Sequence, residues 1–135
     1  MSQSVVEGGC LCGALRYRVK GQPIVSGICH CRTCRRTASA PTLPFVTFAA
    51  DQFILMRGTP SDFHSSQGVT RSFCGRCGSP LTYRSDSEPG QIDVMTCSLD
   101  DPEAYPPAFH IWVSHRLSWD LLPDGLRFYD TTSTD

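Results

Sequence analysis

The spacing of the cysteines points most directly to chemistry. Seven of the eight cysteines fall in three short clusters whose members are one or two residues apart. Sulfurs at this spacing can bind one tetrahedral ion, because a tight turn directs them to one side at a Zn–S distance of about 2.3 Å. A disulfide fits this spacing badly, since it needs Cβ atoms roughly 3.5 to 4.5 Å apart. The clusters are Cys10-x-Cys12, Cys29-x-Cys31-x-x-Cys34 and Cys74-x-x-Cys77.

The start of the sequence supports the same interpretation. Residues 1–7 lack the basic start and the apolar stretch of a secretory signal, so we expect a cytoplasmic protein. Cytoplasmic thiols are kept reduced, and clustered cysteines there are typical of metal sites rather than of a disulfide framework. We therefore predict zinc as the bound metal.

The number of ligands predicts how the clusters combine. A structural zinc takes four protein ligands, whereas a catalytic zinc commonly takes three and keeps a position for water or substrate. Cys10 and Cys12 with Cys74 and Cys77 would make a closed four-sulfur site, and Cys29, Cys31 and Cys34 a three-sulfur site with an open position. Two alternatives stay open. His30 or a distant residue could complete the second site, so that both ions only hold the fold, or the clusters could pair differently.

An open position on a three-thiolate zinc suits the binding of a thiol. Coordination displaces the thiol proton and holds the thiolate for attack on an aldehyde carbon. A zinc ion can also polarise a carbonyl oxygen as a Lewis acid, and the sequence does not choose between the two. Nearby guanidinium groups could bind substrate carboxylates in bidentate fashion, or could be surface charges or donors to zinc-bound sulfur. The candidates are Arg32, Arg35 and Arg36, beside the ligand cysteines, and Arg71, just before Cys74.

Two residues lie outside this ligand set. His30 stands between two ligand cysteines, and we expect it to point away as a spacer rather than to act as a general acid. Cys97 has no clustered partner, and we expect it to be a small buried hydrophobic residue.

Short apolar segments between frequent glycines and prolines predict a mainly β fold of antiparallel sheets with zinc-pinned loops. Leu15, Tyr17 and Val19 alternate with arginines, which is the period of a half-buried strand. Helical turns are expected only near 34–40 and 101–104. Further strands are predicted at 24–28, 44–48, 53–57, 62–65, 69–73, 81–84, 92–96 and 109–113.

Length and composition indicate one soluble domain. The 135 residues are 40% hydrophobic, and no apolar run approaches the roughly 20 residues of a membrane span. We assign residues 5–128 to a single zinc-binding domain and residues 129–135 to a flexible C-terminal tail. The formal net charge of −1 would become about −4 with two zinc ions and seven thiolates. That charge gives no support to a nucleic-acid or membrane partner, and a homodimer stays open.

Several segments together resemble one known family. They are GCLCGALRY (9–17), CHCRTCRR (29–36), RSFCGRCGSPL (71–81), SLDDP (98–102) and the stretch from HIW (110–112) to Trp119. In this order, and covering about residues 8–128, they are similar to the glutathione-dependent formaldehyde-activating (GFA) family, whose domain also occurs in centromere protein V.

The resemblance implies an Mss4-like fold with two zinc sites and a carbon–sulfur lyase that resembles S-(hydroxymethyl)glutathione synthase. The implied substrates are glutathione, or a related small thiol, and formaldehyde. Cys29, Cys31 and Cys34 match the catalytic site, and the other four clustered cysteines match the structural one. His110 matches a family position near the pocket, although a buried, hydrogen-bonded histidine is the alternative.

The chain departs from the family pattern at Ser39 and at Cys97, where glycine is usual. A non-catalytic zinc-stabilised binding module, or an enzyme of the same fold with another small substrate, are the alternative functions.

Overall fold

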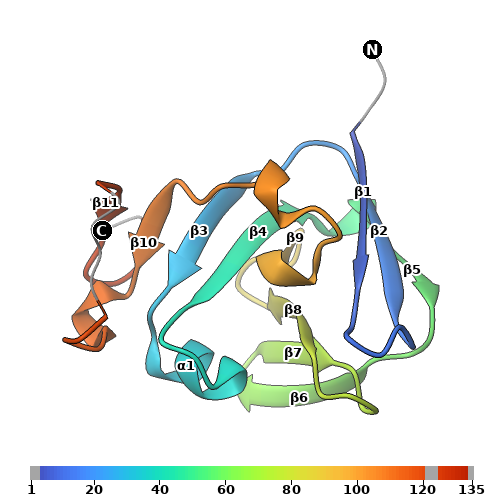
Figure 1. Ribbon diagram of the computed structural model, residues 1–135, viewed down its shortest axis with the longest axis horizontal. Coiled ribbons are helices and arrows are strands. Elements are labelled where there is room, and N and C mark those ends of the chain that lie inside the picture. Colours follow the sequence, from blue (N-terminus) through green and yellow to red (C-terminus); the bar gives the residue numbers. More distant parts are fainter. Residues whose placement is uncertain (1–3, 121–124, 134–135) are drawn as a thin grey trace.

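Two β-sheets form the body of the protein in the computed structural model, which describes residues 4–120 and 125–133. A three-stranded sheet has the order β1-β2-β5, and an eight-stranded sheet has the order β11-β10-β3-β4-β9-β8-β7-β6. Figure 1 shows the small sheet at one side, β10 and β11 at the other, and the helix α1 below β3 and β4. The strands are β1 (Val5–Gly9), β2 (Arg16–Lys20), β3 (Val25–Cys29), β4 (Leu43–Ala49), β5 (Phe53–Arg57), β6 (Ser61–Ser66), β7 (Val69–Phe73), β8 (Pro80–Ser85), β9 (Gln91–Met95), β10 (Phe109–Ile111) and β11 (Arg127–Phe128).

Helical structure is sparse. The α-helix α1 (Arg32–Ala38) is seven residues long, and four single 3₁₀ turns accompany it in the described residues. These turns are η1 (Ala50–Gln52), η2 (Thr96–Ser98), η3 (Pro102–Ala104) and η4 (Val113–His115). None of the helices in the described ranges is long and apolar enough to cross a membrane.

The predicted mainly β class is confirmed, and the predicted strands correspond to β2 through β10, with the predicted ends for β5 and β7 and shifted ends for the others. The pairing is not antiparallel throughout, because β10 runs parallel to both β3 and β11. The sequence prediction missed β1, where Gly8 and Gly9 interrupt the apolar alternation. Gly8 lies opposite Tyr17, and a Cβ there would overlap the Tyr17 hydroxyl. Glycine is therefore needed for this close approach of the strands.

The large sheet has a buried core on each face. Alternating residues of a strand point to opposite faces, and in β4 Val46 and Phe48 join one apolar cluster while Leu43 and Phe45 join the other. The first cluster includes Tyr17 and lies between the sheets. The second includes Met95 and the three cysteines near α1. One face thus holds the two sheets together, and the opposite face supports a candidate site.

The chain beyond β11 is hydrogen-bonded to the end of β10 and to the segment that follows it. The backbone N–H groups of Trp112 and Val113 donate hydrogen bonds to the carbonyls of Thr131 and Tyr129. The domain boundary at residue 128 stays a prediction, and the end of the predicted tail, residues 134 and 135, lies outside the described residues.

Candidate metal centres and the adjoining cavity

Two tight turns bring four cysteines together. Cys10 and Cys12 lie in the turn between β1 and β2, and Cys74 and Cys77 lie in the turn between β7 and β8. Each turn has a glycine with positive φ directly after its second cysteine, Gly13 in one and Gly78 in the other. This left-handed conformation is open to glycine at little cost, and it lets the chain reverse beside the sulfurs.

The four sulfurs have the geometry of a metal site. All lie within 4.8 Å of one another, and the Cys10–Cys12 and Cys12–Cys74 sulfur distances are 3.6 and 3.8 Å. A tetrahedron with Zn–S bonds of about 2.3 Å has edges of about 3.8 Å, whereas a disulfide joins sulfurs about 2.0 Å apart. Backbone N–H groups stabilise negative sulfur here, because Cys10 Sγ accepts from Leu15 and Cys74 Sγ accepts from Cys77.

The other cluster forms where β3 ends and α1 begins. Cys29 is the last residue of β3, Cys31 is the N-cap of α1 and Cys34 lies in its first turn. Cys31 Sγ accepts a hydrogen bond from the Cys34 backbone N–H at 3.3 Å, as an N-cap oxygen would. The three sulfurs lie within 4.8 Å of one another, and no fourth metal-binding side chain of the described residues joins the group. Both clusters could hold metal ions, with four and three protein ligands respectively.

Hydrogen bonds shift the pKa of most of these thiols, and lower it at Cys31 and Cys77. Hydrogen bonds from the Cys29 and Cys34 thiols lower the pKa of Cys31, which favours the thiolate form of this residue. In the four-cysteine cluster, the Ser79 hydroxyl lies 3.2 Å from Cys77 Sγ, and this hydrogen bond lowers the pKa of Cys77 to about 5. Thiolates are the form that binds metal. The donor sets therefore fit a soft or borderline ion such as zinc.

A cavity of about 220 Å³ opens beside the three-cysteine cluster. Its walls are mostly apolar, and the polar groups converge from the strands of the large sheet. Besides the three cysteines, the lining residues are Leu43, Phe45, Arg71, Tyr83, Asp93, Met95, Ile111, Trp112 and Thr132. An apolar cavity with a few polar groups is the usual form of a small-molecule site.

A row of directly opposed residues forms the polar wall. Arg71 on β7 pairs with Tyr83 on β8, Tyr83 pairs with Asp93 on β9, and Asp93 pairs with Thr47 on β4. The Arg71 guanidinium lies over the Tyr83 ring at 5.0 Å and donates to Cys34 Sγ at 3.6 Å and to Ser65 Oγ at 3.0 Å. Burial raises the pKa of Tyr83 and of Asp93.

Trp112 also lines the cavity, and its backbone has an unusual conformation. Its φ of 59° is in the left-handed region, which a bulky residue rarely adopts and which often marks functional sites. Its ring packs against His115 at 5.0 Å, and its backbone N–H donates to the Thr131 carbonyl. These contacts hold the indole at the cavity.

The predicted substrate-binding residues lie in different places. Arg71 lines the cavity, whereas Arg32 is exposed at the start of α1 and Arg35 lines a separate surface pocket with Trp119. His110 is buried on β10, with Nδ1 2.9 Å from His30 Nε2. Burial is the main cause that lowers the pKa of His30, and the neighbouring His110 lowers it further. The structure thus brings Arg71 to the three cysteines, and pairs the two histidines away from the cavity lining.

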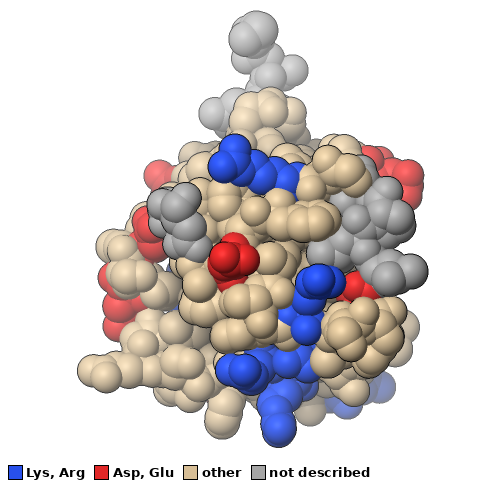
Figure 2. All heavy atoms as spheres, turned by 90° about the vertical axis from the view of Figure 1, so that its left-hand side faces the viewer, with Lys and Arg blue, Asp and Glu red and all other residues tan. Residues whose placement is uncertain are grey.

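Basic residues also gather on the surface near α1, the helix that carries Cys34. Figure 2 shows Lys and Arg side chains gathering at the lower end of the face that carries β10 and α1, at the level of α1 in Figure 1. The helix contributes Arg32, Arg35 and Arg36. Such a patch raises the local concentration of anionic small molecules.

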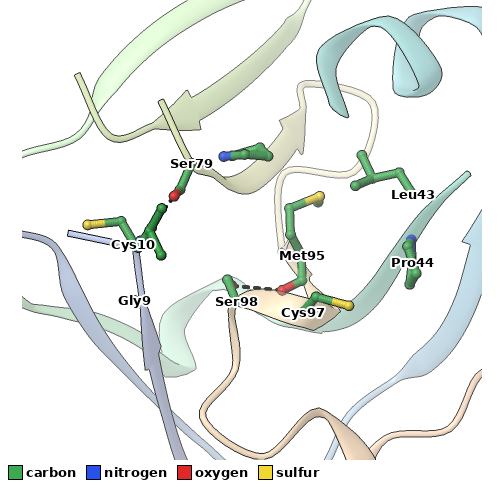
Figure 3. A pocket seen from close by; sticks show the side chains of 10 residues that line it. Gly9, Cys10, Leu43, Pro44, Ser79, Met95, Cys97 and Ser98 are labelled. Atoms are coloured by element: carbon green, nitrogen blue, oxygen red, sulfur yellow. Dashed lines mark hydrogen bonds between the residues drawn. The ribbon is translucent and has the colours of Figure 1, made fainter. Parts of the chain in front are cut away.

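The expectation of a buried Cys97 is wrong. Cys97 is exposed, because the 3₁₀ turn η2 directs Thr96 inward and leaves Cys97 at the surface. It lines a second pocket, which Figure 3 shows between Cys10 and Ser79 on one side and Leu43 and Pro44 on the other. Cys97 lies across this pocket from Cys10 and belongs to neither cysteine cluster.

Sequence reasoning missed Asp93 and Tyr83. Both look like ordinary strand residues, and only the pairing of β8 with β9 places them opposite each other. The one signal available in the sequence is a charged residue between Ile92 and Val94, the only break in an otherwise apolar segment.

Comparisons with known proteins identify a family, two relatives and a structure of the same fold. The profile of the family described as glutathione-dependent formaldehyde-activating enzyme matches residues 5–115. A Halomonas elongata protein named "Putative glutathione-dependent formaldehyde-activating enzyme" is 27% identical over 124 residues, which cover 85% of this chain and 79% of that protein. An uncharacterised lyase of Schizosaccharomyces pombe is 28% identical over 116 residues, covering 73% and 82%. The crystal structure of a Rhodobacter sphaeroides protein has the same fold, with a TM-score of 0.58 at 19% identity, covering 90% and 98%.

Proposed function

This chain belongs to the family of glutathione-dependent formaldehyde-activating enzymes, and we propose that it is a zinc-dependent carbon–sulfur lyase that condenses formaldehyde with glutathione or cleaves the adduct. The observation that carries the proposal is the cavity beside Cys29, Cys31 and Cys34, which gives a small molecule access to a three-sulfur cluster. A cluster that only held the fold would need no such cavity.

The chain's own residues have distinct roles in this proposal. Cys29, Cys31 and Cys34 would hold a zinc ion, which supplies an open coordination position for the substrate thiolate when bound. Arg71 donates to Cys34 Sγ and so balances negative charge on the ligand sulfurs. The apolar walls exclude water from the reacting carbon. Cys10, Cys12, Cys74 and Cys77 would hold a second, structural zinc.

Surface arginines support an anionic substrate. Arg32 directly follows a ligand cysteine and is exposed, and Arg35 lies one turn further along α1. We assign both to the attraction of glutathione carboxylates, and His110 to the support of the loop that carries His30. We also assign the protein to the cytoplasm, because seven clustered thiols and an exposed Cys97 suit a reducing compartment.

Exchange NMR tests this function directly. Glutathione and ¹³C-formaldehyde would be mixed with the zinc-loaded protein, and the rate of exchange between free formaldehyde and the adduct measured. We expect exchange above the spontaneous rate, and a return to that rate after chelation. Equal rates with and without zinc-loaded protein would contradict the enzyme proposal and favour a non-catalytic zinc-stabilised module. Replacing glutathione by 2-mercaptoethanol tests whether the carboxylates matter.

A further inference from the structure

One carboxyl group faces the cavity beside the three cysteines. Asp93 is the only Asp or Glu among the described residues that line it. It is half-buried in β9, near the middle of the large sheet, where neighbouring strands fix its backbone on both sides. A carboxylate in a mostly apolar wall costs solvation free energy, and such a group beside a cavity is a candidate for a chemical role.

The carboxyl group is oriented by one hydrogen bond. The Thr47 hydroxyl, directly opposite on β4, donates to Asp93 Oδ1 at 2.6 Å. No donor in residues 4–120 or 125–133 is bonded to the other oxygen, Oδ2. Asp93 therefore has one oxygen fixed and one available to a molecule in the cavity.

The surroundings adjust the proton affinity of Asp93. Burial raises its pKa, while the Thr47 hydrogen bond and the Arg71 charge act in the opposite direction. These opposing effects suit a group that both accepts and returns a proton. The titratable and charged groups around it are Glu88, Arg71, Tyr83 and the cysteines of the cavity, Cys29, Cys31 and Cys34.

The proposed reaction requires such a group. In the adduct RS–CH₂–OH, cleavage removes the hydroxyl proton as the C–S bond breaks, and the electron pair of the O–H bond forms the C=O bond. The electron pair of the C–S bond leaves on sulfur. The three cysteines serve the sulfur end, and Arg71 is committed to Cys34 and Ser65.

We infer that Asp93 is the catalytic residue that accepts the hydroxyl proton during adduct cleavage and donates it to the aldehyde oxygen during condensation, an inference that rests on the proposed function. Cleavage converts RS–CH₂–OH and the Asp93 carboxylate into formaldehyde, RS⁻ and the Asp93 carboxylic acid. Atoms and charge balance without another reactant, and solvent later takes the proton. Thr47 is a positioning residue that directs the carboxyl group.

The test compares Asp93→Asn with a matched control. Asn has the same shape and can still accept the Thr47 hydrogen bond, but it cannot take a proton. Asp62→Asn is the control, because Asp62 also accepts a hydroxyl hydrogen bond across two strands of this sheet, from Ser72 at 2.7 Å, yet lies outside the cavity. Exchange rates of glutathione and ¹³C-formaldehyde would be measured from pH 5 to 9, with zinc content for each protein.

Loss of general acid–base catalysis should lower the exchange rate by about 100-fold or more in Asp93→Asn. Zinc content and glutathione concentration dependence should stay unchanged, the pH dependence should flatten, and Asp93→Glu should recover part of the rate. Asp62→Asn should match the wild type. A rate within about threefold of the wild type in folded, zinc-loaded Asp93→Asn would overturn the role of Asp93 and leave the lyase function standing. No acceleration by the wild type would overturn both.

A second variant covers the case in which Asp93→Asn does not fold. Thr47→Val keeps the carboxyl group but removes the hydroxyl that orients it. We expect a smaller loss, about tenfold, with the pH dependence retained. An unchanged rate in Thr47→Val would contradict a positioned carboxyl group.

Discussion

At the scale of single residues, the eight cysteines differ in what surrounds their sulfurs. Seven lie in clusters where sulfurs are within 4.8 Å of one another. Cys97 stands apart, exposed at the rim of another pocket. Metal binding would mask the clustered thiols, including exposed Cys12, and leave Cys97 accessible.

Thiol titration should reveal this difference. In the zinc-loaded protein, we expect one thiol per chain to react quickly with a chromogenic disulfide reagent, and none to do so in Cys97→Ser, because bound thiolates are protected. Chelation should make the remaining thiols reactive. Several fast thiols in the zinc-loaded wild type would show that the clusters do not hold metal as proposed.

Residue types and spacing predicted the metal clusters well, because their ligands are local pairs and triplets such as Cys29, Cys31 and Cys34. They did not predict Asp93 or the exposure of Cys97. Asp93 acquires its setting from strands whose registers depend on the whole sheet. Cys97 is turned outward by a 3₁₀ turn that has no clear sequence signature.

At the scale of elements, the end of α1 carries local strain. Ser39 is its C-cap, with φ 50° and ψ 47°, in the left-handed region. Glycine is the residue that adopts this conformation readily. Glycine is usual at this position in the family that the sequence resembles. The left-handed backbone conformation gives a physical reason for that preference.

Replacing Ser39 by glycine should stabilise the protein. Relief of the left-handed strain should raise the free energy of unfolding by about 1 kcal/mol, measured by urea denaturation of the zinc-loaded protein. Ser39→Ala is the matched control, since it removes the hydroxyl but keeps the Cβ, and it should give no gain. Equal effects of the two substitutions would refute the strain explanation.

The strand β2 places a phenol in the core between the sheets. Tyr17 is fully buried, and its hydroxyl lies 2.6 Å from Ser98 Oγ. Burial raises the pKa of Tyr17 above its usual value, so the folded protein favours the protonated phenol. Its contribution to stability is therefore complete below the unfolded pKa of about 10 and is lost as pH rises further.

Tyr17→Phe should weaken this alkaline sensitivity. Well above pH 10, each pH unit should lower the free energy of unfolding of the wild type by about 1.4 kcal/mol through this phenol, and the first unit, from pH 10 to 11, by about 1 kcal/mol. The variant lacks that contribution, so its free energy of unfolding should fall by about 1 kcal/mol less between pH 10 and 11. Urea denaturation at several pH values measures the slope, with zinc content checked at each. Parallel slopes would be the contrary result.

At the scale of the whole molecule, the four-cysteine cluster joins the two sheets. One of its turns connects β1 and β2 of the small sheet, and the other connects β7 and β8 of the large one. Structural zinc contributes about 10 to 16 kcal/mol in small peptides. We therefore expect loss of this site to unfold the protein, and loss of the three-cysteine site to spare the fold.

The mainly β class and most strands were predictable because alternation and turn residues are local signals. The parallel pairing of β10 with β3 was not predictable from local signals, because most of the chain separates the two strands. The strand β1 was hidden by its two glycines, which allow the close approach of Tyr17 at Gly8 and of the Leu15 carbonyl at Gly9. The cavity likewise exists only once six strands and α1 are assembled.

The exchange rate of Cys31→Ala tests the division between a structural and a chemical site most directly. The variant would be zinc-loaded, its zinc content and circular dichroism checked, and its glutathione–formaldehyde exchange compared with that of the wild type. We predict a folded protein with one zinc ion fewer and exchange at the spontaneous rate. Wild-type exchange in this variant, or its complete unfolding, would contradict the account.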